Sequence, residues 1–233
     1  MTRYLEQLSA PWAQAFEWAW RSFRDGNVGV GAVVVDPDGQ VLGYGRNRTN
    51  DREARHNELV GSAVAHAEVN ALTNIPAGDH LDHAVVTTFQ PCLMCTGALV
   101  LSHVGTVRYA GPDPLMDGLA GLPELNAYAG RRWPAVWDGP LLDEWGVLGA
   151  LLPIIYTAQH RLEGNTMKAY RKHLPATTAL AVSLAESGEA QGLAQRPSLD
   201  VALDKLWGRL GGATRELRRF QGAFADDARP GPR

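Results

Sequence analysis

The chain has 233 residues, of which 45% are hydrophobic and 20% are charged, so it is long enough for one soluble domain with an appendage. Its longest apolar stretch, residues 145–159, is interrupted by Gly146, Gly149 and Pro153 and is shorter than the roughly 20 apolar residues of a membrane span. No basic segment leads into an apolar run at the N-terminus, and both cysteines lie in one Cys-x-x-Cys. We therefore expect a cytoplasmic protein in a reducing compartment.

The net charge of −3 is unevenly distributed along the chain. Residues 1–160 contain 10 Arg, no Lys and 17 Asp or Glu, a net charge of −7. Residues 161–233 contain 12 Lys or Arg and 8 Asp or Glu, a net charge of +4. Proteins that bind nucleic acid usually carry a basic surface where the phosphates lie. The acidic first part therefore argues against a polynucleotide as the ligand of that part.

Residues 11–25 predict an amphipathic helix. Trp12, Phe16, Trp20 and Phe23 recur at the spacing of one helical face. Such aromatic side chains either form a ligand box or face the core, and at this spacing we interpret them as core.

A hairpin is expected next. Residues 28–35 form a valine-rich run typical of a buried strand, residues 36–39 have turn chemistry, and residues 41–45 return as a second strand. The polar loop over residues 49–58 follows, and loops of this length are often functional. We expect this loop to border the site.

The central part of the chain alternates between helices and strands. We expect helices over residues 65–74 and 92–102, and strands over residues 84–89 and 104–110. A strand, a short helix and a second strand predict a parallel pair with a right-handed crossover.

The remaining sequence is less regular. Residues 111–125 are a loop rich in Gly and Pro, and residues 135–159 contain a further helix or strand pair that the pattern does not resolve. A short helix is expected over residues 177–185, and an amphipathic helix over residues 199–210 ends at Gly211-Gly212. The aromatic side chains between the loop and the last helices either stack on a base or lie in the core: Tyr128, Trp133 and Trp137.

Two short motifs carry chemistry. His66-Ala67-Glu68 is followed about two dozen residues later by Pro91-Cys92-Leu93-Met94-Cys95. One imidazole and two thiolates hold Zn²⁺ and leave the fourth tetrahedral position for water, while a glutamate that is not a ligand moves protons. The spacing therefore predicts metal ligands at His66, Cys92 and Cys95 and a catalytic role for Glu68.

Two other interpretations, a redox cysteine pair and a structural zinc site, explain fewer residues of this motif. A redox Cys-x-x-Cys would leave His66-Ala67-Glu68 and the preceding proline as coincidences. A structural zinc site needs four protein ligands, and no third cysteine exists. A fourth ligand would have to come from another histidine, for which the candidates are His56, His80, His83 and His103.

The sequence resembles the cytidine-deaminase-like superfamily, in the branch that contains tRNA adenosine deaminases and bacterial guanine, cytosine and nucleoside deaminases. The likeness covers roughly residues 12–120. The matching segments are residues 30–35, 45–48, 66–72, 91–98 and 102–107, together with Asp113. The resemblance implies a three-layer α/β/α domain with a five-stranded mixed sheet, here with a helical C-terminal extension, and commonly a homodimer or higher homo-oligomer.

The resemblance also implies a zinc cofactor and a substrate-binding set. Asn47 is implied as a substrate contact, and Asp113 falls where relatives keep an acidic residue in the substrate loop. The chain has Phe89-Gln90 where many relatives have Leu-Glu, so one carboxylate of the substrate pocket is missing. We therefore expect the edge of the base to be recognised by other contacts. The expected substrate-binding residues are Asn47, Ala67, Phe89, Gln90, Pro91 and Asp113. The 49–65 loop is longer than in tRNA editors, and their basic C-terminal helix is not obvious.

We expect a deaminase domain over residues 1–160, a helical extension over residues 161–224 and a disordered tail over residues 225–233. The extension is interpreted as helices packed on their own domain or across a dimer. The favoured function is hydrolytic deamination of a free nucleobase or nucleoside through a zinc-bound hydroxide and Glu68, with a purine slightly ahead of cytosine. The alternatives are a tRNA adenosine or single-stranded nucleic-acid deaminase and a non-catalytic, zinc-stabilised partner subunit.

Overall fold

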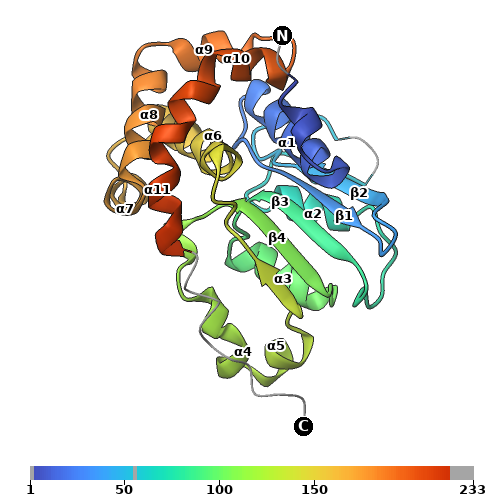
Figure 1. Cartoon of the computed structure of the whole chain (residues 1–233). Coiled ribbons are helices and arrows are strands. Elements are labelled where there is room, and N and C mark those ends of the chain that lie inside the picture. The colour runs from blue at the N-terminus through green and yellow to red at the C-terminus, as the bar shows by residue number, and fades with distance from the viewer. Residues whose placement is uncertain (1–2, 55–56, 221–233) are drawn as a thin grey trace.

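A five-stranded mixed sheet forms the centre of the molecule (Figure 1). The computed structural model describes residues 3–54 and 57–220. The strand order is β2-β1-β3-β4-β5. The strands are Gly31–Val35 (β1), Val41–Arg46 (β2), Ala84–Phe89 (β3), Thr106–Gly111 (β4) and Val136–Asp138 (β5). The predicted five-stranded sheet is confirmed.

Strand direction brings three strand ends to one edge of the sheet. β1 pairs antiparallel with β2 and with β3, whereas β3, β4 and β5 run parallel. The predicted hairpin and parallel pair are therefore confirmed. Because β2 and β3 both oppose β1, β2, β3 and β4 point in the same direction. Segments that follow these three strands meet at their shared carboxyl edge, where open α/β sheets usually bind ligands.

Helices cover both faces of this sheet, as the three-layer expectation requires (Figure 1). α1 (Ala10–Arg24) lies on one face, where Ala15 packs with Val33 and Val35. α2 and α3 lie on the other face, and α6 packs against β3, β4 and α1. These three helices are Ala67–Leu72 (α2), Leu93–Leu101 (α3) and Glu144–Arg161 (α6).

The sequence analysis did not resolve the secondary structure of segments whose hydrophobic residues follow no regular spacing. Residues 135–159 contain the three-residue strand β5 and most of α6, whose residues are buried almost all round, so α6 lacks an amphipathic stripe. The predicted loop over residues 111–125 contains two 3-10 turns and a short helix, which α5 follows. These elements are η2 (Pro114–Met116), η3 (Leu119–Gly121), α4 (Leu122–Leu125) and α5 (Ala127–Arg132).

The helical extension packs onto the body of the molecule (Figure 1). Its buried side chains belong to the same core cluster as those of the sheet and α6. The Glu216 carboxylate accepts hydrogen bonds of 2.9 Å from the backbone N–H groups of Ala176 and Thr177, which caps α8. The Leu5 N–H donates to Asp200 Oδ1 at 3.1 Å, near the start of α10. The helices are α7 (Asn165–His173), α8 (Pro175–Glu186), α9 (Glu189–Ala194), α10 (Leu199–Leu210) and α11 (Thr214–Leu217), with the 3-10 turns η1 (Leu5–Gln7), η4 (Gly211–Ala213) and η5 (Arg218–Phe220).

The helices expected over residues 177–185 and 199–210 are present as α8 and α10, whereas α7 and α9 were not predicted. The division at residues 160 and 224 stays a prediction. The tail over residues 225–233 lies outside the described residues. Within the described part of the chain, no helix combines the length and the apolar character needed to cross a membrane.

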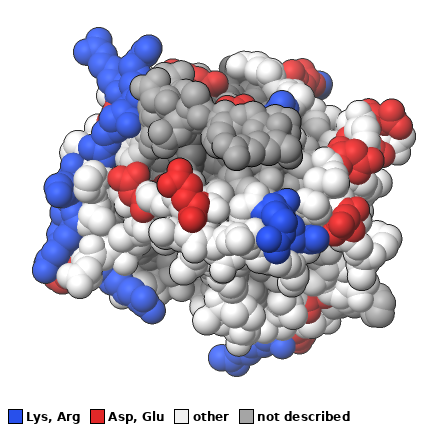
Figure 2. Space-filling view, turned by 90° about the horizontal axis from the view of Figure 1, so that it is seen from below, with Lys and Arg blue, Asp and Glu red and all other residues white. Residues whose placement is uncertain are grey.

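Lys and Arg side chains line one edge of the molecule. Figure 2 shows Lys and Arg side chains along one edge, on the side where α7 lies in Figure 1. Within residues 3–54 and 57–220, several cations of the extension form no ion pair: Lys168, Arg171, Lys172, Arg215 and Arg218. In contrast, Arg46 and Arg48 of the sheet region pair with nearby carboxylates.

Trp137 and Trp133 stack on each other with ring centroids 4.9 Å apart, and Trp137 is buried in the main core. Tyr128 is half exposed, and its ring lies beside the Arg132 guanidinium, 5.6 Å from it. The tryptophans are therefore core residues.

Replacing Gly45 with alanine is expected to destabilise the protein and its metal site together. A Cβ at Gly45 would lie 2.2 Å from the Ala67 carbonyl oxygen and 2.4 Å from the Ala71 nitrogen, both in the backbone of α2. Overpacking of this kind typically costs about 1–3 kcal/mol of unfolding free energy. Because His66 directly precedes α2, zinc content should fall as well.

Denaturant unfolding and zinc analysis measure these effects. Gly208→Ala is the matched control, because Gly208 is exposed on α10 and a Cβ at that position would meet no atom of another element within 4 Å. Equal stability and zinc content for Gly45→Ala and the control would contradict the prediction.

Candidate metal centre and active site

Two helix starts position the predicted metal ligands. His66 caps α2 and Cys92 caps α3, both with extended backbone, and Cys95 lies in the first turn of α3. The sequence predicted both helices but placed His66 and Cys92 one position inside them. The positive end of a helix dipole favours thiolate over thiol, so this placement suits metal-binding sulfurs.

The three ligand atoms have the spacing of a zinc site. His66 Nδ1 lies 3.5 Å from Cys92 Sγ and 3.5 Å from Cys95 Sγ, and all three atoms lie within 4.8 Å of one another. Tetrahedral zinc with ordinary Zn–S and Zn–N bonds places sulfur and nitrogen about 3.6 Å apart. One imidazole and two sulfurs therefore fit Zn²⁺, which is the cofactor that this donor set supports.

The cluster has three members among the described residues, which leaves a fourth tetrahedral position free of protein ligands. Three of the histidines considered for a structural site make other contacts. His80 Nε2 lies 2.9 Å from the Pro76 carbonyl oxygen, His83 contacts Asp82, and His103 contacts Asp79. His56 lies outside the described residues.

The three side chains of this cluster shift one another's pKa values. A hydrogen bond from Cys95, opposed by burial and helped by His66, lowers the pKa of Cys92 to about 4. The same bond to Cys92, together with burial and the negative charge of Glu68, raises the pKa of Cys95. The pKa of His66 is raised, chiefly by its bond to Cys92. A divalent cation displaces such protons when it binds, so metal affinity should rise with pH.

Glu68 lies beside the ligands without belonging to their cluster. Its side chain is only 3% exposed, Oε1 accepts a hydrogen bond of 3.2 Å from Thr87 Oγ1, and Oε2 lies 3.3 Å from Cys95 Sγ. Burial raises the pKa of the Glu68 carboxyl, and the neighbouring His66 imidazole opposes that shift. A carboxyl with a raised pKa next to a metal centre is suited to accept and return protons near neutral pH.

Three of the predicted substrate contacts follow the strands that end at the shared edge. Asn47 follows β2, Gln90 follows β3 and Asp113 follows β4, and the three side chains are 3%, 5% and 7% exposed. Asn47 Oδ1 accepts from the Thr49 N–H, Gln90 Oε1 accepts from the Asp113 N–H at 3.0 Å, and Asp113 Oδ1 accepts from the Leu115 N–H.

The other polar atom of each side chain has no hydrogen-bond partner among the described residues and is not fully sealed from solvent. Asn47 Nδ2 and Gln90 Nε2 are therefore free donors, and Asp113 Oδ2 is a free acceptor. Ala67, Phe89 and Pro91 are buried around the metal ligands and offer no side-chain hydrogen bond. Their contact with substrate stays a prediction.

Sequence reasoning missed an ionic network behind Asn47. Arg48 Nε donates to Asp51 Oδ2 at 2.6 Å, Arg46 contacts the same oxygen at 2.9 Å, and Asn27 donates to Asp51 Oδ1. Burial opposes ionisation of Asp51, but the bonds from Asn27 and Arg48 prevail and lower its pKa. The network anchors the start of the 49–58 loop next to Asn47. Opposite charges three residues apart, at positions 48 and 51, were the available clue.

Asp113→Asn is expected to stabilise the metal-free protein above pH 6. Burial raises the pKa of Asp113 to about 6, whereas an unfolded aspartate titrates near 3.9. The folded state therefore disfavours the ionised form, and wild-type stability falls as pH rises from about 4 to about 6. Asparagine removes this cost, roughly 2–3 kcal/mol, and retains an oxygen for the Leu115 N–H.

Thermal unfolding of chelator-treated protein from pH 4 to pH 8 measures the difference, since a nearby cation would favour the carboxylate. The advantage of Asp113→Asn should vanish near pH 4 and reach a plateau above pH 6. An advantage that does not change with pH would contradict the assigned pKa.

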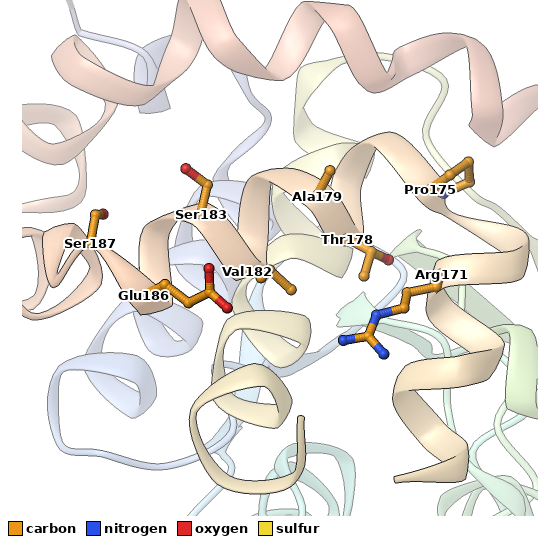
Figure 3. A pocket seen from close by; sticks show the side chains of 8 residues that line it. All are labelled: Arg171, Pro175, Thr178, Ala179, Val182, Ser183, Glu186 and Ser187. Carbon is orange, nitrogen blue, oxygen red and sulfur yellow. The ribbon is translucent and has the colours of Figure 1, made fainter. Parts of the chain in front are cut away.

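A hollow of about 700 Å³ lies elsewhere, along α7 and α8 (Figure 3). Its side chains include Arg171, Thr178, Ser183 and Glu186, and none of the metal ligands contributes to it. The metal centre and this hollow are therefore separate features.

A mixed sheet covered on both faces, with a His-Cys-Cys cluster and an adjacent carboxyl at the carboxyl edge, defines the class of zinc deaminase folds. Residues 5–110 match the family model described as "Cytidine and deoxycytidylate deaminase zinc-binding region". This segment of the chain is therefore similar to that family.

The relatives differ in the activity that their names state. A tRNA(Ile)-lysidine synthase of Deinococcus radiodurans is 32% identical over 175 residues, which are 73% of this chain and 28% of that protein. A cytosine deaminase of Candida albicans is 36% identical over 90 residues, 37% of this chain and 55% of that protein. The chain thus spans about a quarter and about half of the length of these two relatives. A solved guanine deaminase from Nitrosomonas europaea has 22% identity and a TM-score of 0.44, covering 68% of this chain and 94% of that one.

Proposed function

We propose that this protein is a zinc-dependent hydrolase that deaminates a free nucleobase or nucleoside, with purines slightly ahead of cytosine. The observation that carries the proposal is the buried Glu68 carboxyl beside a cluster of three ligands whose fourth position is open. A purely structural zinc site has no use for that carboxyl.

Glu68 performs the proton transfers in the proposed reaction. Zinc, when held by His66, Cys92 and Cys95, supplies a Lewis acid that lowers the pKa of water at the site. Glu68 accepts a proton from the water as its oxygen bonds to the ring carbon that carries the amine, and it delivers that proton to the adjacent ring nitrogen. The second water proton passes to the amine, the C–N bond breaks, and ammonia leaves as the ring carbonyl forms.

A small substrate suits the polar groups at the carboxyl edge. Asn47, Gln90 and Asp113 are almost fully buried, yet each keeps one polar atom without a partner among the described residues. Two donors and one acceptor are sufficient to orient a base by its edges. The acidic charge of residues 1–160 gives no attraction to a phosphate backbone.

A substrate panel tests this proposal. Zinc-loaded protein is incubated with guanine, adenine, cytosine and their nucleosides, and ammonia release is measured. We expect turnover of at least one purine. Silence across the whole panel, with one zinc bound per chain, would reject the proposal.

A base carried in tRNA or single-stranded nucleic acid is the second candidate substrate. The Lys and Arg side chains along the edge shown in Figure 2 favour it, as does the lack of ion pairs at several described cations of the extension. Relatives named tRNA-specific adenosine deaminase, from Streptococcus pyogenes, are 26% identical over 125 residues. A salt-dependent shift of labelled tRNA would support this candidate, and the absence of any shift at low salt would remove it.

A cytoplasmic homodimer is also proposed. Leu93 and Leu101 are exposed on α3 about two turns apart, and Leu125 is exposed on α4, which contacts α5, a neighbour of α3. Apolar side chains gathered in this way often mark an interface. Light scattering of the purified protein measures the oligomeric state.

A further inference from the structure

Two adjacent threonines interrupt the apolar run of strand β3 near the centre of the sheet. Thr87 and Thr88 follow Val85 and Val86, and both threonines are fully buried. Because successive side chains of a strand point to opposite faces of the sheet, the two hydroxyls lie in different surroundings. A buried hydroxyl is costly unless it makes a hydrogen bond, so each of them should have a specific contact.

The contacts of the two hydroxyls differ. Thr88 Oγ1 accepts a hydrogen bond of 3.1 Å from the Gly31 N–H, which joins β3 to the start of β1. Thr87 Oγ1 lies 3.2 Å from Glu68 Oε1 and 3.3 Å from the Phe89 carbonyl oxygen. A hydroxyl donates only one proton, and a carboxylate is a stronger acceptor than a peptide carbonyl. The Thr87 hydroxyl therefore donates to Glu68.

Thr87 is the partner that Glu68 keeps when a metal binds. Among the described residues, the Glu68 carboxyl has two side-chain partners, which are Thr87 at Oε1 and Cys95, whose Sγ lies 3.3 Å from Oε2. A cysteine binds zinc as a thiolate, which has no proton to donate. With zinc bound, Oε1 therefore keeps its donor, whereas Oε2 loses one and lies next to the metal ligands.

We propose that Thr87 is a positioning residue that holds Oε1 of Glu68 and thereby makes Oε2 the oxygen that carries the proton. Glu68 lies in the first turn of α2 and Thr87 in β3, so their hydrogen bond ties the proton carrier to the centre of the sheet. A carboxylate that is fixed by one oxygen is oriented for transfer by the other. The inference deepens the proposed function, on which it rests, because it assigns separate roles to the two oxygens.

Thr87→Val removes the hydroxyl with little change in shape. The zinc-loaded variant is assayed for ammonia release from a base that the wild type turns over. We expect kcat to fall about tenfold or more, as for the loss of one hydrogen bond to a charged group, while KM stays within about twofold. Zinc content should remain at one per chain. Thr87→Ser keeps the hydroxyl and should hold kcat within about threefold of the wild type.

Thr88→Val is the matched control for this experiment. It removes a hydroxyl as deeply buried as that of Thr87 and leaves the Gly31 N–H without its acceptor, so it should lower stability at least as much. Its kcat should nevertheless match that of the wild type, because Thr88 does not contact Glu68. Should Thr87→Val fail to fold, Thr87→Ser and Thr87→Ala differ by the same oxygen and provide the comparison.

The carboxyl carbon of Glu68 gives a readout that does not depend on activity. In zinc-loaded protein with ¹³C-labelled glutamate carboxyls, the NMR signal that Glu68→Gln removes belongs to Glu68. Thr87→Val should displace this signal, because the carboxyl loses its donor at Oε1. Thr88→Val and Thr87→Ser should leave the signal near its wild-type position.

The outcomes separate this inference from the deaminase proposal. An unchanged kcat in Thr87→Val, an equal fall in Thr88→Val, or a carboxyl signal that does not move would overturn the inference even if the wild type releases ammonia. The absence of ammonia from every substrate would instead reject the proposed activity. A signal displaced in Thr87→Val but not in Thr88→Val would then still support the contact by which Thr87 holds Glu68.

Discussion

Glu68→Ala is expected to lower kcat for ammonia release by about 10²–10⁴-fold or more while zinc remains bound. The carboxyl is buried beside the metal ligands but lies outside their cluster, so its loss removes the proton carrier and leaves the ligands in place. An ammonia-coupled assay gives kcat, and elemental analysis gives the zinc content of the same preparation.

Glu124→Ala is the control for this prediction, because Glu124 is exposed on α4. Its activity should match that of the wild type. If Glu68→Ala retained activity within a few-fold of the wild type with zinc bound, another group would have to move the protons. If its zinc were lost, Glu68 would be a ligand and the site would be closed.

Cys92→Ser is expected to lose zinc and to reduce ammonia release to the background rate. Three residues form the proposed metal cluster, and no fourth His, Cys, Asp or Glu joins it among the described residues. Exchange of a soft thiolate for a hydroxyl should weaken zinc binding at least about 100-fold, beyond the 10–100-fold typical of residues that only support a ligand. Zinc retained after dialysis against a chelator measures the effect.

His83→Ala is the matched control for ligand removal, since His83 pairs with Asp82 away from the cluster. It should keep both zinc and activity. A Cys92→Ser protein that holds a full equivalent of zinc after dialysis would show that the metal is bound elsewhere.

The parts of the site that local sequence determines were predictable. His66, Glu68, Cys92 and Cys95 lie at helix starts, where spacing of two and three residues fixes which side chains meet. The strands β1 to β4 were predicted within three residues at each end, because runs of β-branched residues between turns are a local pattern.

The parts that depend on long-range packing were not predictable. Nothing within the sequence of α7 indicates that this helix packs against η2, the turn that follows Asp113. β5 has only three residues, and α6 is apolar on all sides. Neither segment therefore shows the hydrophobic periodicity that distinguishes a helix from a strand. The net charge of residues 1–160 alone was also an incomplete basis for judging nucleic-acid binding. The basic extension packs against this acidic part, so its cations lie on the surface of the same folded unit.

The contact of Leu5 with Asp200 joins the N-terminal end of the described chain to α10, and the contact of Glu216 with the start of α8 joins its C-terminal end to the first part of the extension. We therefore expect cooperative thermal unfolding, in which the sheet and the helices of the extension melt in a single transition. Fragments that stop before residue 198 would expose core leucines and leave α8 uncapped, so limited proteolysis should yield intact chain and small peptides but no long-lived deaminase core.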